Sequence, residues 1–123
     1  MEDFVVPPDK LLPFMTELKS VGEATGVLFR GVSHAGDGNI HLDLLRKGFT
    51  DEADECRRIA AFEDKACEAA YRLGGAISGE HGIGQARKAL FEKYTDPVEL
   101  ELMKALKRAW DPKGILNPGK IFD

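Results

Sequence analysis

The sequence predicts an α+β fold, in which helices pack on a small antiparallel sheet. Apolar residues recur at helical spacing in several separate stretches, whereas residues 38–46 alternate apolar and polar side chains as a half-buried strand does. A glycine-rich segment of turn composition lies before this strand and joins it to a second strand-like stretch. The chain has 123 residues, which is enough for one core, so we expect a single domain over residues 1–123.

The first half of the chain is expected to contain one helix and a β-hairpin. Residues 1–8 should be an extended lead-in, because consecutive prolines disfavour helix before them. Residues 9–21 carry apolar side chains at helical spacing, and Pro13 must then lie in the first turn of that helix or kink it. Residues 26–33 are strand-like, and the turn that follows pairs them with residues 38–46.

The second half of the chain is expected to be mainly helical. A long helix should run from Thr50, as its N-cap, to Leu73, before Gly74 and Gly75 end it. A short segment over residues 76–78 follows. A further helix should begin near Gln85.

The last predicted helix begins at Asp96-Pro97, where an aspartate cap precedes proline at the first helical position. Asp111-Pro112 should end it. Its apolar residues recur at helical spacing and are expected to form a buried face: Leu102, Met103, Leu106 and Trp110.

Composition excludes several classes of protein. The formal net charge of −4 and the lack of a basic cluster argue against a nucleic-acid partner. No apolar run approaches the roughly 20 residues of a membrane span, and the acidic, proline-bearing N-terminus does not resemble a targeting peptide. The two cysteines lack the spacing of metal ligands and suit a reducing compartment. We therefore expect a cytoplasmic protein.

All three histidines lie in two glycine-rich segments. His34 and His41 flank the turn of the predicted hairpin, so their imidazoles can meet at its mouth, while Glu80 lies in the second segment. Two histidines and one carboxylate are a frequent ligand set for a catalytic divalent metal. Two tight turns with incidental histidines would show the same residues, and spacing alone leaves both interpretations open.

His81 and Asp43 are candidates for supporting roles. His81 precedes a predicted helix start, whose positive dipole end would disfavour imidazolium and suit a general base. It is equally a candidate for a further ligand or a plain turn residue. Asp43 shares a strand face with His41 and could orient that ring, although a surface carboxylate is an equally good interpretation.

Three segments together resemble the FAD-linked oxidases of the vanillyl-alcohol oxidase type. Residues 34–41 match His-x-Gly-Asp-Gly-Asn-x-His, residues 79–84 match Gly-Glu-His-Gly-x-Gly, and residues 111–120 match Asp-Pro-x-x-x-Leu-Asn-Pro-Gly-Lys. The chain resembles in particular the C-terminal domains of D-lactate dehydrogenase, D-2-hydroxyglutarate dehydrogenase and glycolate oxidase flavoprotein subunits. The resemblance covers nearly the whole chain.

The resemblance implies roles for individual residues. His34, His41 and Glu80 would bind a divalent zinc, manganese or iron ion. His81 would take the hydroxyl proton of a small 2-hydroxy acid while hydride passes from its α-carbon to the flavin of FAD, and Asn117 would lie against that flavin. A divalent ion with one carboxylate ligand leaves about one positive charge, which suits an anionic substrate.

The chain departs from the family pattern in two respects. Some relatives carry a substrate-contacting asparagine where this chain has Asp43, and a carboxylate there would repel an acidic substrate or add a metal ligand. The 123 residues have no room for a flavin-binding domain and are expected to supply only some strands of the family's ferredoxin-like cap sheet. We therefore expect the isolated chain to be inactive alone. An exposed sheet edge left by the missing strands should favour self-association or pairing with a flavin-binding subunit.

Two other functions fit the same residues. A small non-redox module, metal-binding or hydrolytic, could use the histidines and Glu80 to activate water instead of a hydroxy acid. A non-catalytic interaction domain could retain the family fold without its chemistry.

Overall fold

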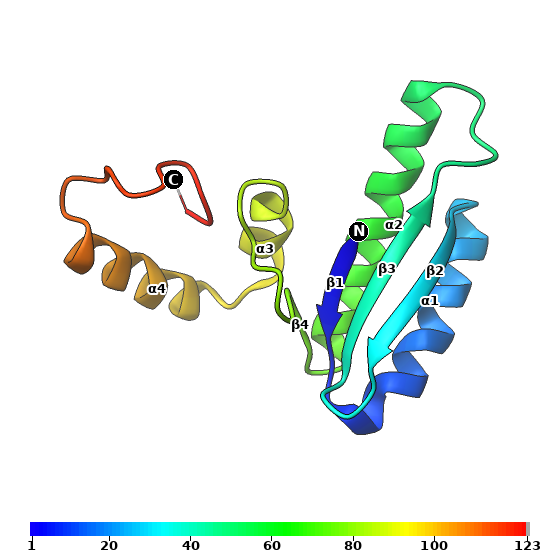
Figure 1. Cartoon of the computed structure of the whole chain (residues 1–123), viewed down its shortest axis with the longest axis horizontal. Helices are drawn as coiled ribbons and strands as arrows, with labels where there is room; N and C mark the ends of the chain where they lie inside the picture. The colour runs from blue at the N-terminus through cyan, green and yellow to red at the C-terminus, as the bar shows by residue number, and fades with distance from the viewer. Residues whose placement is uncertain (123) are drawn as a thin grey trace. The chain divides into compact units, whose positions relative to one another are not determined.

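The computed structural model describes residues 1–122 and divides the chain into two compact units, Met1–His81 and Gly82–Asp123, each of which is described by itself. Unit 1 contains a sheet and its covering helices (Figure 1). In chain order its elements are β1 Glu2–Val5, the 3-10 helix η1 Pro8–Lys10, α1 Leu11–Thr25, β2 Leu28–His34, β3 Asn39–Leu45, α2 Glu52–Arg72 and β4 Ala76–Ile77.

The four strands form one sheet in the order β2-β3-β1-β4, and each neighbouring pair is antiparallel. This confirms the predicted α+β class and the hairpin of β2 and β3. With α1 after β1 and α2 after β3, the order of elements is βαββαβ, which is the ferredoxin-like arrangement. Unit 1 thus contains a complete βαββαβ set.

The strand β1 was predicted only as an extended lead-in, yet it lies inside the sheet between β3 and β4. Its register places Asp3 opposite His41 and Phe4 opposite Ile40. Just beyond the strand, the Val6 amide donates to the Gly38 carbonyl at 3.0 Å, which ties the chain to the hairpin turn before Pro8 starts η1. The lead-in is therefore structural and carries a carboxylate into the centre of the sheet.

Helices α1 and α2 cover one face of the sheet (Figure 1). Phe4 and Ile40 project to that side and are buried with Phe14 of α1 and Phe62 of α2; the Phe4 and Phe14 rings meet edge to face at 5.6 Å. Apolar burial of this kind is the main stabilising contribution in a unit of this size. Opposite residues of an antiparallel pair share a face, so Asp3, Val32 and His41 project to the other side.

The long helix α2 begins one residue later than predicted. Asp51, and not Thr50, is the N-cap, because its carboxylate accepts from the Asp54 amide at 2.8 Å. Phe62, Ala66 and Ala69, which recur at helical spacing at the centre of this helix, are buried.

Unit 2 contains α3 Lys88–Tyr94 and α4 Pro97–Trp110. The helix expected near Gln85 begins only at Lys88. The cap of α4 is confirmed, since Asp96 accepts from the amides of Val98 and Glu99.

The predicted buried face of α4 is wrong. Leu102, Leu106 and Trp110 are 63%, 62% and 85% exposed, Met103 is half-buried, and the buried residue of the helix is Leu100. Within the described residues of unit 2, no element covers the apolar stripe that the spacing defines. None of the helices in this part of the chain combines the length and the apolar character that a membrane span needs.

Candidate metal centre

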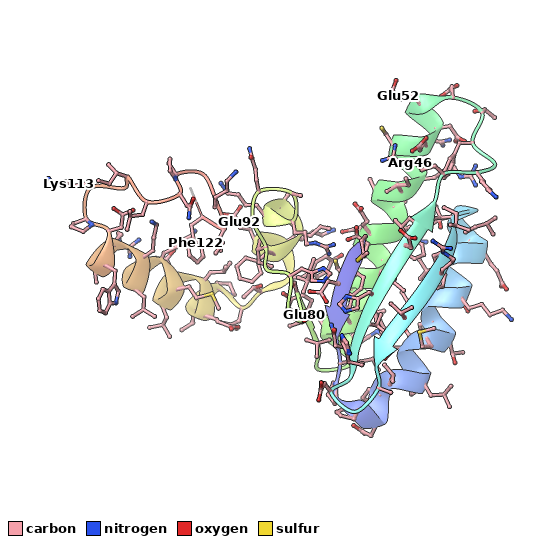
Figure 2. All side chains as sticks on the ribbon, in the orientation of Figure 1. Arg46, Glu52, Glu80, Glu92, Lys113 and Phe122 are labelled. Atoms are coloured by element: carbon pink, nitrogen blue, oxygen red, sulfur yellow. The ribbon has the colours of Figure 1, made fainter. Side chains whose placement is uncertain are left out.

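The predicted ligands His34, His41 and Glu80 come together on the open face of the sheet. His34 ends β2, His41 lies in the middle of β3, and Glu80, labelled in Figure 2, lies in the turn that follows β4. The Glu80 Oε1 atom is 2.9 Å from His41 Nε2 and 3.3 Å from His34 Nε2. The ligand atoms of these residues all lie within 4.8 Å of one another.

These separations fit a shared divalent ion. Bonds of about 2.0–2.1 Å at angles between octahedral and tetrahedral place neighbouring ligand atoms about 2.9–3.4 Å apart. Both measured distances fall in that interval. The 2.9 Å separation also suits a hydrogen bond from a protonated His41 Nε2 to Glu80, so metal binding here would replace a proton.

The rings of the histidines are arranged around His41. The His34 ring meets it edge to face at a centroid distance of 5.4 Å, and the His81 ring stacks on it at 4.6 Å. His41 is buried, whereas His34 and His81 are exposed. The cluster therefore has one fixed ring with an accessible ring on each side.

The helix-dipole argument for His81 is wrong. The next helix, α3, begins at Lys88 and lies in unit 2, so no helix start adjoins His81. What the structure shows for His81 is a ring stacked on His41 and a backbone amide that donates to Asp3 at 2.8 Å.

Asp3 is the residue of this site that sequence analysis missed. Its carboxylate is completely buried and accepts hydrogen bonds from the Ser78 hydroxyl, the Glu80 and His81 amides and the Asn39 side chain. Burial alone would raise the pKa of Asp3, but these donors outweigh it and hold the pKa well below the ordinary value of 3.8. The available sequence signal was an acidic pair, Glu2 and Asp3, directly before the apolar residues 4–6.

A second group of possible ligand atoms consists of Asp3, His41 and His81. The oxygens of Asp3 already accept hydrogen bonds from four different groups, which leaves little capacity for an ion. The Glu80 carboxylate is about half exposed and faces both imidazoles. The His34, His41 and Glu80 group is therefore the better metal site.

Two glycines allow the turns to approach β1. Gly38 has a φ of +72°, and a Cβ atom there would collide with the Val6 carbonyl. A Cβ atom on Gly79 would collide with the Asn39 amide group and lie 3.1 Å from Asp3 Oδ1. The glycines of both motifs thus permit the close contact that brings the histidines and Glu80 together.

Asp43 does not orient His41 as sequence analysis suggested. Its carboxylate accepts from the Arg30 guanidinium at 2.6 Å, and that hydrogen bond holds the pKa of Asp43 below its ordinary value. Asp43 also belongs to neither group of candidate ligands among the described residues. Arg30 instead offsets the charge that would have repelled an acidic substrate.

A pocket of about 290 Å³ opens on the same face of unit 1 as the histidines. Its lining combines the ligand candidate His41 with an ion pair and apolar groups: Met1, Arg30, Gly31, Val32, His41 and Asp43. A small molecule in this pocket would therefore contact His41 directly.

Asn117 lies in unit 2. Its contact with a flavin stays a prediction. It lies in a turn in which the Lys120 amide donates to its carbonyl at 3.3 Å. The end of this turn returns to the second glycine-rich motif, because the Ile121 amide donates to the Gly84 carbonyl at 2.7 Å and Lys120 Nζ to Gln85 Oε1 at 3.0 Å.

Residues 1–121 match the family described as FAD linked oxidases, C-terminal domain. The chain is 38% identical over 119 residues to a D-lactate dehydrogenase of Anaerostipes hadrus. This alignment covers 97% of the chain and 25% of the relative. It is 40% identical over 89 residues to a D-2-hydroxyglutarate dehydrogenase of Stutzerimonas stutzeri, covering 72% of the chain and 19% of the relative. The chain is 34% identical over 126 residues to glycolate oxidase subunit GlcD of Bacillus subtilis, and this alignment covers 99% of the chain and 26% of the relative. The chain thus spans about a quarter of the length of these relatives.

Proposed function

Because the chain belongs to the family of FAD linked oxidase C-terminal domains, we propose that it is the metal- and substrate-site portion of an FAD-dependent 2-hydroxy acid dehydrogenase or oxidase. The observation that carries the proposal is the convergence of His34, His41 and Glu80 at ligand spacing on one face of unit 1. The names of the relatives, which include D-lactate and D-2-hydroxyglutarate dehydrogenases, favour a small 2-hydroxy acid as substrate.

His34, His41 and Glu80 are the residues that would hold a divalent zinc, manganese or iron ion. When bound, the ion would polarise the substrate hydroxyl as a Lewis acid. Two neutral imidazoles and one carboxylate leave about one positive charge at such a centre, which attracts an anionic hydroxy carboxylate.

His81 is the residue that accepts the hydroxyl proton in this proposal. Its ring is exposed and stacks on His41 at 4.6 Å, so a hydroxyl group beside the ligand cluster lies near its ring nitrogens. The Asp3 carboxylate holds its backbone amide, which limits how far the ring can drift.

The pocket beside His41 is the proposed place for the substrate. The paired Arg30 and Asp43 side chains present a polar wall with no net charge, and Val32 and Met1 supply apolar surface. A pocket of about 290 Å³ is small, which suits a compact hydroxy acid.

FAD supplies the acceptor for the hydride that leaves the substrate α-carbon. We expect these 123 residues to need a flavin-binding subunit or domain for turnover, with Asn117 against the flavin. Without it, the exposed β2 edge favours pairing of two copies. The expected location is the cytoplasm.

Metal content of the purified chain tests the proposal. We expect about one divalent ion per chain, and loss of more than about a hundredfold in affinity on His34→Ala or Glu80→Gln, because each change removes a ligand. Glu23→Gln, which removes an exposed carboxylate of α1, is the matched control for Glu80→Gln. A wild-type chain without stoichiometric metal, or equal affinity in all variants, would contradict the proposed centre.

His81→Ala separates the base from a ligand. With a flavin-binding partner supplied, this variant should retain its metal and lose about 10²–10⁴-fold in kcat for hydroxy acid oxidation. Loss of the metal would make His81 a ligand instead. Hydrolysis without any flavin requirement would favour the non-redox alternative.

A further inference from the structure

The Asp3 carboxylate connects the two glycine-rich segments of the metal centre. It lies on β1, between the strand that carries His41 and the turn that carries Glu80 and His81. It is completely buried and accepts hydrogen bonds from four groups: the Asn39 side chain, the Ser78 hydroxyl and the Glu80 and His81 amides. Burial of an ionised carboxylate costs free energy unless hydrogen-bond donors compensate its charge.

One oxygen of Asp3 holds the Glu80–His81 turn. Oδ2 accepts from the Glu80 amide and the His81 amide, each at 2.8 Å, and also from the Ser78 hydroxyl. Two consecutive amides bound to one oxygen fix the backbone from which both side chains project. The direction of the Glu80 carboxylate toward His34 and His41 therefore depends on this contact.

The other oxygen of Asp3 faces His41. Oδ1 accepts from Asn39 Nδ2 at 2.7 Å and lies 3.4 Å from His41 Nδ1. That nitrogen is buried and makes no hydrogen bond within the described residues, so a shift of about 0.5 Å toward Asp3 would give it a partner. A proton on Nδ1 that points to Asp3 leaves the lone pair of Nε2 directed at Glu80, where an ion would bind.

We infer that Asp3 is the positioning residue of the metal centre: it selects the Nδ1–H tautomer of His41 and fixes the turn that presents Glu80 and His81. The inference rests on the proposed metal site and adds a residue that lies outside the glycine-rich motifs. Gly79 supports it, because a Cβ atom at that position would occupy the space in which Asn39 meets Asp3.

Asp3→Asn is the informative substitution. The remaining oxygen can still accept from the Glu80 and His81 amides. The new amide replaces the oxygen that accepts from Asn39 Nδ2, so the Asn39 side-chain amide must turn over to accept through Oδ1, which is buried and has no partner among the described residues. The fold is therefore expected to survive. An amide that faces His41 Nδ1 as a donor, however, moves the ring proton to Nε2 and blocks the metal-binding nitrogen.

Zinc titration by calorimetry compares this variant with Asp43→Asn. Both substitutions remove one carboxylate from the same face of the sheet, but Asp43 contacts Arg30 and not the ligands. We expect Asp3→Asn to weaken zinc binding by about 10–100-fold and Asp43→Asn to leave it within about threefold.

The tautomer of His41 gives a readout that a purely structural role would not move. In the zinc-loaded wild-type chain, ¹⁵N shifts should show His41 bound through Nε2 and protonated at Nδ1, as a hydrogen bond from Nδ1 to Asp3 requires. If Asp3→Asn does not fold, the wild-type spectrum decides by itself.

The outcomes separate this inference from the proposed function. A wild-type chain that binds no zinc overturns the metal centre and the inference with it. A wild-type chain that binds zinc with His41 coordinated through Nδ1, or equal affinities for Asp3→Asn and Asp43→Asn, overturns the role of Asp3 and leaves the centre standing.

Discussion

Helix α2 in unit 1 buries its apolar stripe in a core, whereas α4 in unit 2 leaves most of its apolar residues in solvent. Phe62 and Ala66 of α2 are completely buried, but Leu106 and Trp110 of α4 are 62% and 85% exposed. Both helices have a clear apolar stripe and an aspartate N-cap. An amphipathic pattern therefore predicts a helix and its apolar face, whereas burial of that face requires another element to cover it.

The proposed site residues are divided between the two units. The proposed ligands lie in unit 1, where the sheet is supported by α1 and α2 and its register is set by continuous strand pairing. Asn117 lies in unit 2, in an exposed turn. We therefore expect the metal centre to be rigid and the segment around Asn117 to open at lower cost in free energy.

Truncation of one apolar residue in each helix should give the largest contrast. Phe62→Ala leaves a cavity in the core of unit 1 and should lower the free energy of unfolding by about 3–5 kcal/mol. Leu106→Ala on the exposed stripe should change it by less than about 0.5 kcal/mol. Urea denaturation followed by circular dichroism measures both, and a large loss for Leu106→Ala would mean that its stripe is covered in solution.

Acid should destabilise unit 1 through Asp3. The pKa of this carboxylate is held below its ordinary value of 3.8 by hydrogen bonds that outweigh the effect of burial. A depressed pKa in the folded state gives stability that is present above the unfolded value and is lost as pH falls below it.

The wild-type chain should therefore lose stability between about pH 5 and pH 3 faster than Asp3→Asn does, by at most about 1.4 kcal/mol per pH unit for one proton. Thermal unfolding at several pH values in the metal-free chain makes the comparison. Parallel pH profiles for the two proteins would show that Asp3 does not titrate with folding.

Removal of the helix caps should give the smallest changes in stability, and these changes should appear in different units. Asp51→Ala and Asp96→Ala each remove a carboxylate that accepts backbone amides at a helix start, at a cost of about 0.5–2 kcal/mol. For Asp51 the loss should appear in the global unfolding of unit 1, whereas for Asp96 it should appear as faster amide exchange confined to α4. Faster exchange throughout the chain in Asp96→Ala would show that the two units unfold together.

Local patterns in the sequence were sufficient for much of the fold. The β2–β3 hairpin follows from alternation and a glycine turn, and the start of α4 follows from Asp96-Pro97, because each depends on neighbouring residues only. The strand β1 could not be found in this way. Four residues beside a proline pair become a strand only when β3 and β4 supply hydrogen-bonding partners.

The residues of the candidate site likewise differ in whether local patterns or long-range pairing place them. The histidines, Glu80 and their glycine-rich turns could be identified from local patterns, because hairpin geometry and motif composition are local properties. The fold was needed to show that Asp3 faces His41, that Asp43 pairs with Arg30 and that the stripe of α4 stays exposed. Each of these depends on which strand or surface lies alongside, and long-range pairing leaves no mark in the spacing of neighbouring residues.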